Sequence, residues 1–214
     1  YIAGINIESI YQETVKSNKY TPYNGLVLTD TFQLYEQERD LIADLLPDNS
    51  NKRTQQKKRD IKLIIGNPPY SSGQKSMEDD TKNLKYFNLD NKISSLYLNS
   101  NSSSLKRKLY DSYIRAFCWA TERVSDEGVI SFITGSGWID KSFASGMRKH
   151  LENHFNKIYI LDLKGDIRKN ILAKNNDEGE NIFGQGSMTG ISVTFLIKKK
   201  QKKQQCEINY LDIG

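Results

Sequence analysis

Four consecutive residues, Asn67, Pro68, Pro69 and Tyr70, combine groups that could activate an amino group. Each proline fixes φ at about −65° and lacks an N–H donor, so the carbonyl oxygens beside them are stiffly held without a competing donor. Asn67 adds a side-chain carbonyl oxygen and Tyr70 a flat ring. Two acceptors that bind both hydrogens of a planar NH2 group would localise the nitrogen lone pair for attack on an electrophilic methyl group. Adenine and glutamine amides carry such groups.

The residues before this turn must position it. Leu63, Ile64 and Ile65 form a short apolar run, which predicts a strand covered on both faces, and Gly66 ends the strand where the backbone approaches another group closely. Asn-Pro-Pro could be a turn and nothing more, because these dipeptides punctuate loops. Open α/β sheets bind their ligands at the carboxyl ends of strands, so we favour the ligand-binding interpretation.

Asp30 follows a second predicted strand. Residues 26–28 are apolar and the chain then continues through Thr29, Asp30 and Thr31 to Phe32. In a doubly wound sheet a carboxylate at this place faces the ligand crevice and can accept a hydrogen bond from an adenine amino group. The same side chain could instead cap a helix that begins near Phe32. Spacing alone does not choose between the two roles.

The remaining pattern alternates between helices and strands. Helices are predicted over residues 1–18, 33–46, 109–124 and 142–154, and strands over residues 129–134, 157–163 and 191–197. Residues 48–60 and 71–104 are polar and are interpreted as loops or insertions, the second of which could close over a cofactor and a target base. The chain is therefore predicted to be one α/β domain.

Phe183 lies among glycines just before the strand at residues 191–197. A base drawn out of a duplex loses stacking worth a few kcal/mol and needs an aromatic surface in its new pocket. An isolated Phe in such a loop could equally anchor the loop to the core.

These motifs resemble those of a known family. Residues 67–70 look like the catalytic motif of amino-methyltransferases that use S-adenosylmethionine, above all the DNA adenine-N6 enzymes. Residues 108–120 look like the adenine methylase domain of large single-polypeptide restriction-modification enzymes. The resemblance implies a partial class I methyltransferase (Rossmann-like) sheet with helices on both faces and a C-terminal β-hairpin. Residues 1–214 would be the C-terminal portion of the catalytic domain.

The resemblance also implies roles for single residues. Asp30 and Phe32, with Asn67, would contact S-adenosylmethionine, since residues 28–32 lie where these enzymes hold the cofactor's adenine. Asn67 Oδ1 and the Pro68 carbonyl would accept the two N6 hydrogens of a flipped adenine, which would stack between Tyr70 and Phe183. The N6 nitrogen would then attack the methyl group in line. No general base or metal is needed, because the proton is lost after the nitrogen becomes cationic.

The implied partner is double-stranded DNA, with nuclease, helicase and target-recognition domains expected in the same parent chain. One departure from the family is that no glycine-rich cofactor loop lies between Tyr1 and Gly25. We therefore expect a fragment, since Tyr1 is not an initiator methionine, and expect the isolated chain to bind cofactor poorly. A protein-glutamine or RNA methyltransferase, or a non-catalytic DNA-binding subunit, are the alternatives.

The amino-acid composition limits which functions the chain could have. Lys and Arg outnumber Asp and Glu by 31 to 26, a net charge of +5, which is compatible with a polyanionic partner. Cys118 and Cys206 are too few for a disulfide framework, so a reducing compartment, the cytoplasm, is expected.

His150 and His154 stand four apart without a third ligand nearby, so no metal is predicted. The sequence holds no apolar run long enough to span a membrane. Residues 198–203 form a basic run, interpreted as a solvated hairpin end or a phosphate contact.

Overall fold

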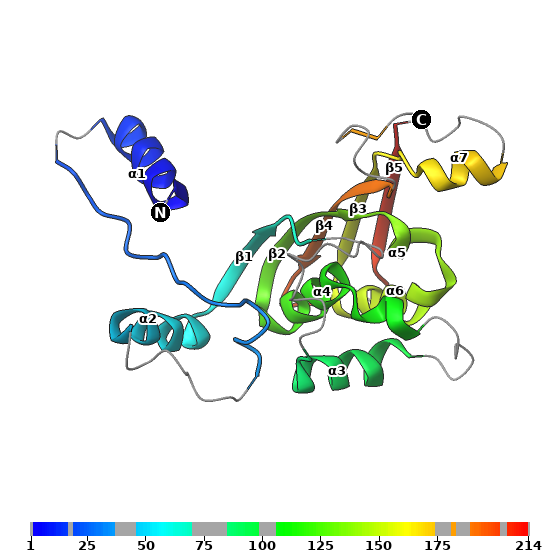
Figure 1. The fold of residues 1–214 in the computed structure, drawn as a ribbon, viewed down its shortest axis with the longest axis horizontal. Coiled ribbons are helices and arrows are strands. Elements are labelled where there is room, and N and C mark those ends of the chain that lie inside the picture. The colour runs from blue at the N-terminus through cyan, green and yellow to red at the C-terminus, as the bar shows by residue number, and fades with distance from the viewer. Residues whose placement is uncertain are drawn as a thin grey trace. The chain divides into compact units, whose positions relative to one another are not determined.

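The computed structural model describes residues 2–16, 19–36, 46–69, 85–98, 106–173, 181–182, 189–201 and 205–213 (Figure 1). The chain divides into two compact units, Tyr1–Arg59 and Asp60–Gly214. Among the described helices, none is long and apolar enough to cross a membrane.

The first unit contains two helices, α1 (Ile2–Val15) and α2 (Pro47–Lys58). Helix α1 confirms the predicted helix at residues 1–18. Helix α2 contradicts the predicted loop at residues 48–60. It is almost wholly polar, but proline stands at its first position, Asp48 lies in its first turn and Lys57 and Lys58 lie in its last. These residues suit the helix start and complement the helix dipole, so the helix forms without an apolar stripe.

The strand predicted at residues 26–28 is wrong. These residues are described and belong to no strand. The Leu28 N–H donates to Asn49 Oδ1 at 2.8 Å, and Asn49 Nδ2 donates to the Leu28 carbonyl at 2.8 Å. One side-chain amide thus satisfies the backbone groups that a neighbouring strand would have bonded. Of the helix predicted at residues 33–46, residues 33–35 form turns and residues 37–45 lie outside the described part.

The second unit is built on a five-stranded mixed sheet in the order β1-β2-β4-β3-β5 (Figure 1). Its strands are β1 (Ile61–Gly66), β2 (Val124–Gly135), β3 (Lys157–Asp162), β4 (Ile191–Lys198) and β5 (Glu207–Asp212). Strands β1 and β2 are parallel, as are β3 and β5, whereas β4 runs antiparallel to both of its neighbours. The predicted strands at residues 63–65, 129–134, 157–163 and 191–197 are all present.

The predicted C-terminal β-hairpin is not formed. Strands β4 and β5 both pair with β3, which lies between them. The chain therefore crosses over β3 after β4, although the sequence between the two strands is short and basic.

The helices of the second unit are α3 (Phe87–Tyr97), η2 (Lys106–Tyr110), α4 (Ser112–Arg123), α5 (Gly137–Asp140), η3 (Ser142–Ala144), α6 (Ser145–His154) and α7 (Ile167–Ala173). Helices α4 and α6 confirm the predictions at residues 109–124 and 142–154. Helix α3 contradicts part of the predicted loop at residues 71–104. It forms because Leu89, Ile93 and Tyr97 recur four apart and are buried on one side of the helix. Residues 71–84 of that passage lie outside the described part.

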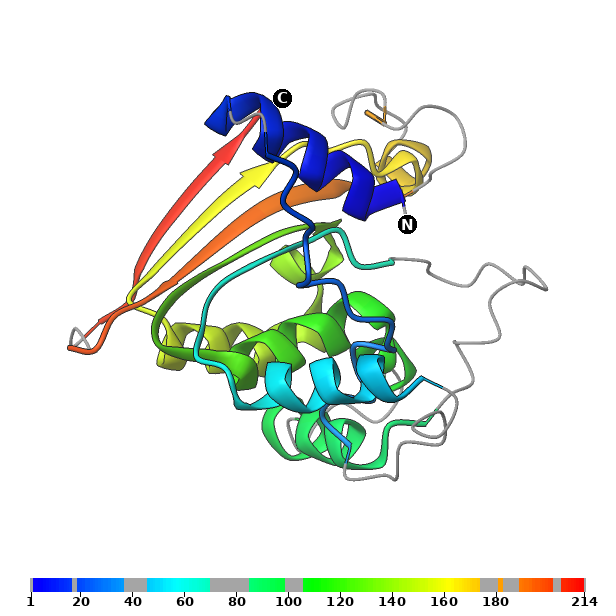
Figure 2. The same ribbon diagram turned by 90° about the vertical axis from the view of Figure 1, so that its left-hand side faces the viewer.

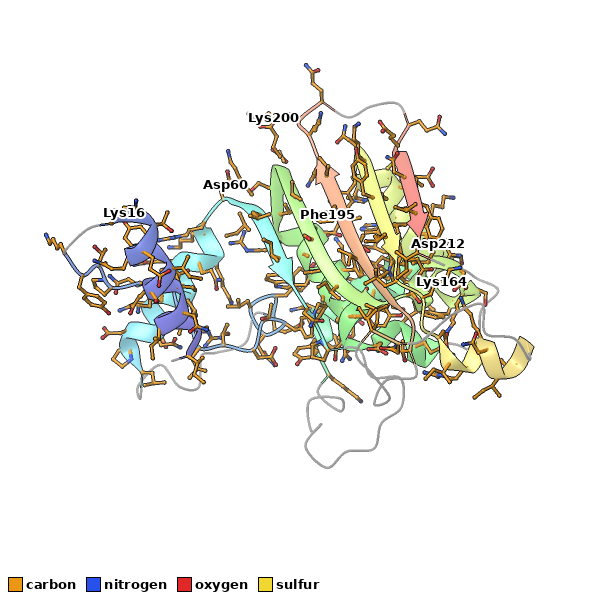
Figure 3. All side chains as sticks on the ribbon, turned by 90° about the horizontal axis from the view of Figure 1, so that it is seen from above. Lys16, Asp60, Lys164, Phe195, Lys200 and Asp212 are labelled. Atoms are coloured by element: carbon orange, nitrogen blue, oxygen red, sulfur yellow. The ribbon has the colours of Figure 1, made fainter. Side chains whose placement is uncertain are left out.

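One face of the sheet is packed against helices (Figure 2). Ile130, Leu196 and Ile158 stand side by side on β2, β4 and β3 and are buried. On the opposite face, Leu63 is 58% and Phe195 43% exposed, and Phe195 is seen on the sheet in Figure 3. The second helical layer expected on that face is not present among the described residues of this unit, and β1 is not covered on both faces.

Candidate active site

The turn after β1 places Asn67, Pro68 and Pro69 at the carboxyl end of a strand, as predicted. Asn67 and Pro69 are exposed and Pro68 is half-buried. Among the described residues, no hydrogen bond to the Asn67 side chain is made. An exposed amide beside two prolines presents acceptor oxygens to an outside molecule, which is the geometry that the chemistry above requires. Tyr70 lies outside the described residues.

Gly66 brings this turn against an aromatic support. A Cβ at residue 66 would lie 3.1 Å from Cε1 of Phe132, the residue paired with it on β2. Phe132 packs edge-on against Phe117 of α4, with ring centroids 5.3 Å apart, and Phe117 contacts Trp138 of α5 at the same centroid distance. The close approach foreseen at Gly66 is therefore to the protein's own core, and helix α4 supports the turn.

Other strand ends meet at the same end of the sheet. Gly66 pairs with Phe132, Gly135 pairs with Ile191, and Asp162 pairs with Ser192. The segments after β2 and β3 therefore lie at the same end of the sheet as the turn of residues 67–69, the first on the neighbouring strand and the second three strand positions away.

Asp162 closes β3 with a buried carboxylate. It accepts hydrogen bonds from the Lys164 N–H at 3.0 Å and from the Tyr210 hydroxyl at 3.0 Å. Burial, and then this hydrogen bond, raise the pKa of Tyr210 to about 12. Tyr210 therefore stays a neutral donor that ties β5 to the end of β3.

A group of polar residues follows, which we call the Asp166 cluster: Lys141, Asp166, Arg168, Asn181 and Thr189. Asp166 Oδ2 lies 3.2 Å from Lys141 Nζ, and Asp166 Oδ1 lies 4.0 Å from Arg168 Nε and accepts the Arg168 N–H at 3.2 Å. Arg168 Nη2 donates to Thr189 Oγ1 at 3.0 Å. The sequence analysis missed this cluster. The one available signal was an aspartate three residues after the end of a predicted strand.

Asn181 joins the two sides of the cluster. Its Nδ2 donates to the Gly165 carbonyl at 3.2 Å and to the Thr189 carbonyl at 2.8 Å, and the residue is buried. Gly165 has φ +81°, and a Cβ there would lie 2.8 Å from the Asn181 Cα, so a glycine is required. The predicted base-stacking residue Phe183 lies outside the described residues, two positions after this anchor.

Asp30 and Phe32 belong to the first unit and are half-buried. Asp30 Oδ1 accepts the Phe32 N–H at 2.9 Å. This bond closes a turn across residues 30–32, but Asp30 does not cap a helix there. The helix it was expected to begin is replaced by turns over residues 31–35.

His150 lies in the core of the helical layer, whereas His154 is exposed. His150 is 7% exposed, its ring centroid lies 3.9 Å from that of His154, and Tyr97 packs against it edge-on at 5.5 Å. Burial, and then the neighbouring His154, lower the pKa of His150 to about 4. Among the described residues, no group of three or more His, Cys, Asp and Glu side chains is arranged for a metal ion.

The basic run after β4 lies far from the turn of residues 67–69. Lys198 pairs with Gly128 near the start of β2, whereas Gly66 pairs with Phe132 near its end. In Figure 3, Lys200 lies at one end of the sheet and Lys164 and Asp212 lie at the other. Lys198, Lys199 and Lys200 therefore cannot supply a phosphate contact beside Asn67.

Comparisons with known proteins agree with the motifs. The sequence profile of the family described as Eco57I restriction-modification methylase matches residues 2–167. The ATP-dependent Type ISP restriction-modification enzyme LlaBIII bound to DNA is similar to this chain with a TM-score of 0.89 and 41% identity, over 100% of this chain and 14% of that one. A nuclease-deletion mutant of the Type ISP enzyme LlaGI, in complex with a DNA substrate mimic, gives a TM-score of 0.88 and 40% identity, over 100% and 17%.

The DrdV–DNA complex gives a TM-score of 0.83 and 31% identity, over 100% of this chain and 20% of that one. A comparison with curated proteins gave no match. This chain thus spans between 14% and 20% of the length of these three similar proteins.

Proposed function

Because this chain belongs to the Eco57I restriction-modification methylase family, we propose that it is the C-terminal portion of the catalytic domain of a site-specific DNA methyltransferase. The parent enzyme transfers a methyl group from S-adenosylmethionine to N6 of an adenine flipped out of duplex DNA. It acts as part of a restriction-modification system.

The observation that carries the proposal is the turn of residues 67–69. This turn follows the carboxyl end of β1 and exposes the Asn67 amide. Gly66 lies close to Phe132, which packs edge-on against Phe117, and these contacts support the turn. Asn67 Oδ1 and the Pro68 carbonyl accept the two hydrogens of the adenine amino group. Acceptors held in place before the reaction cost no reorganisation as the nitrogen becomes cationic. Tyr70 and Phe183 supply the stacking surfaces for the flipped base.

The cofactor site is assigned in part to this chain. S-adenosylmethionine supplies an electrophilic methyl group when bound. The Asp30 carboxylate, fixed by the Phe32 N–H, suits a hydrogen bond from the cofactor's adenine amino group, and Phe32 and Asn67 are further proposed cofactor contacts. The glycine-rich loop of the family is not found in residues 1–25. We therefore assign the adenine end of the cofactor to these residues and expect weak binding by the isolated chain.

The partners follow from the similar proteins. LlaBIII and DrdV are described as bound to DNA, and LlaGI as complexed with a DNA substrate mimic. LlaBIII is described as ATP-dependent, and the LlaGI protein is a nuclease-deletion mutant. Double-stranded DNA is accordingly the proposed substrate, and nuclease, helicase and target-recognition domains are proposed for the parent chain.

The test uses the parent chain with unmethylated DNA and S-adenosylmethionine, followed by digestion to nucleosides and mass spectrometry for N6-methyladenine. Asn67→Ala removes one acceptor and should lower product formation by about 10²–10³-fold, the usual cost of one group that stabilises developing charge. Asn51→Ala, on the exposed side of α2, is the matched control and should leave the rate unchanged.

Three results would reject the proposal in different ways. Methyl transfer to RNA or to protein glutamine, with none to DNA, would assign the same turn to another substrate class. No transfer to any acceptor would favour a non-catalytic DNA-binding role. A methylated base other than N6-methyladenine would overturn the adenine assignment.

A further inference from the structure

We propose that Lys141 and Arg168, held over the buried carboxylate of Asp166, bind one phosphate of the DNA strand that carries the target adenine. This inference rests on the function proposed above. It assigns to the Asp166 cluster a role that is separate from the amino-group chemistry of residues 67–70.

The cluster presents cations to solvent and keeps its anion inside. The side chain of Asp166 is 3% exposed, whereas those of Lys141 and Arg168 are 38% and 46% exposed. A buried carboxylate must be paired, and here its two cationic partners provide that pairing. These three side chains carry two positive charges and one negative charge.

The two cationic heads are fixed before any ligand arrives. Asp166 Oδ2 holds Lys141 Nζ at 3.2 Å, and Thr189 Oγ1 accepts from Arg168 Nη2 at 3.0 Å. Thr189 is itself tied through its carbonyl to the buried Asn181 amide. Side chains that are ordered in advance lose less entropy on binding, so a phosphate gains more from this pair than from two mobile surface lysines. An arginine also offers a planar fork that matches phosphate oxygens.

The position of the cluster suits a contact close to the reacting base. Lys141 follows β2, Asp166 follows β3, and both strand ends lie at the same end of the sheet as the turn of residues 67–69. Asn181, which anchors the cluster, stands two residues before Phe183 in the sequence. A strand whose adenine reaches Asn67 therefore meets the end of the sheet that also carries Lys141 and Arg168.

The neighbouring charges limit the size of the effect. Lys169 pairs with Asp140 at 2.9 Å and Lys164 with Asp212 at 3.6 Å, and the buried Asp162 adds one further carboxylate. Among the described residues, this end of the sheet thus presents no broad basic surface, and the proposed attraction is local to Lys141 and Arg168. We expect one phosphate contact and not a general affinity for DNA.

The test measures binding of the parent chain to duplex DNA containing its target site, at several salt concentrations between about 50 and 200 mM. Arg168→Gln and Lys141→Gln each remove one cation and keep a polar head. Loss of one phosphate contact should lower the magnitude of the slope of log K against log salt by about 1, and weaken binding about eightfold at 100 mM salt. Lys200→Gln makes the same charge change at the opposite end of the sheet, where Lys200 is exposed, and should alter neither quantity.

A second experiment starts from the wild-type protein, so its first result does not depend on whether a variant folds. Duplexes carrying a neutral methylphosphonate at single positions around the target adenine should reveal one position that weakens binding by the wild-type protein. The same methylphosphonate should weaken DNA binding by the Arg168→Gln variant almost no further. The inference is overturned if Arg168→Gln and Lys141→Gln, like Lys200→Gln, leave DNA affinity and its salt dependence unchanged. It is also overturned if the methylphosphonate weakens binding by these two variants as much as it weakens binding by the wild-type protein.

The two proposals fail separately. If the wild-type parent forms N6-methyladenine while the cluster variants bind DNA normally, only the phosphate site is wrong. If the parent binds DNA through this cluster and methylates nothing, the proposed reaction is wrong and the contact stands.

Discussion

The ion pair between Arg115 and Asp90 should be one of the larger single contributions to the stability of the second unit. Arg115 Nε lies 2.8 Å from Asp90 Oδ1, and Nη2 donates to Oδ2 at 2.9 Å, so the pair is bidentate and joins α4 to α3. The two side chains are only 6% and 19% exposed, and the guanidinium lies over the Tyr86 ring at 5.0 Å. Replacing Arg115 by Met leaves the Asp90 carboxylate nearly buried without its cation. Removing one partner of a buried pair costs about 3–5 kcal/mol.

Urea unfolding followed by tryptophan fluorescence would measure this loss. Both tryptophans of the chain, Trp119 and Trp138, lie in α4 and α5, so the signal reports the second unit. We expect Arg115→Met to lower the free energy of unfolding by about 4 kcal/mol. The double variant Arg115→Met, Asp90→Leu should be less destabilised than the sum of the two single variants, with a coupling of about 2 kcal/mol.

The reasoning would be refuted if each single variant lost less than about 1 kcal/mol and the two losses added. The pair would then behave like an exposed surface pair. An unchanged denaturant slope across the series is the control that the unfolding transition itself is the same.

Two further predictions concern buried polar groups. Burial and the neighbouring His154 lower the pKa of His150 from 6.5 to about 4, so the unfolded chain takes up the proton first as the pH falls. Stability should therefore drop between pH 6.5 and 4, by about 3 kcal/mol in urea unfolding, and His150→Phe should remove most of that dependence. Asn181→Asp turns the donor facing the Gly165 and Thr189 carbonyls into an acceptor and should cost about 3 kcal/mol at pH 7. Because this carboxyl would have a raised pKa, thermal unfolding should show the variant partly recovering at pH 5, and a loss that does not change with pH would contradict the argument.

Strands β1 to β4 were predictable from the sequence because each contains an apolar or alternating run next to a turn, whereas no strand was predicted at β5, whose residues are mostly exposed. The site turn followed from them, since Gly66 and two prolines fix where β1 ends. The exposure of Leu63 was not predictable, because an apolar run indicates burial without saying on which faces. The order of the strands was also hidden, and a short basic connection after β4 suggested a hairpin that the sheet does not form.

The errors in the helices have physical causes. Helix α2 has no apolar stripe, so periodicity could not find it, whereas Pro47 at its start and Lys57 and Lys58 at its end could have. The strand expected at residues 26–28 failed because the Asn49 amide bonds the Leu28 backbone, a contact between distant residues. The sequence did not predict the Asp166 cluster for the same reason, because its members come from four separate segments of the chain. The roles of Asp30, Phe32, Tyr70 and Phe183 remain predictions.

The position of β4 sets the order in which this sheet can be made. Strand β4 fills the place between β2 and β3, although it follows both of them in the chain. A ribosome delivers β2 and β3 first, and until residue 198 has emerged β2 has only β1 as a partner and β3 has none. Up to that moment both carry unpaired edges, which other chains can bind. Strand β4 therefore completes the centre of the sheet after both of its neighbours have been made, and the strand that leads into the turn of residues 67–69 lies two places away from it.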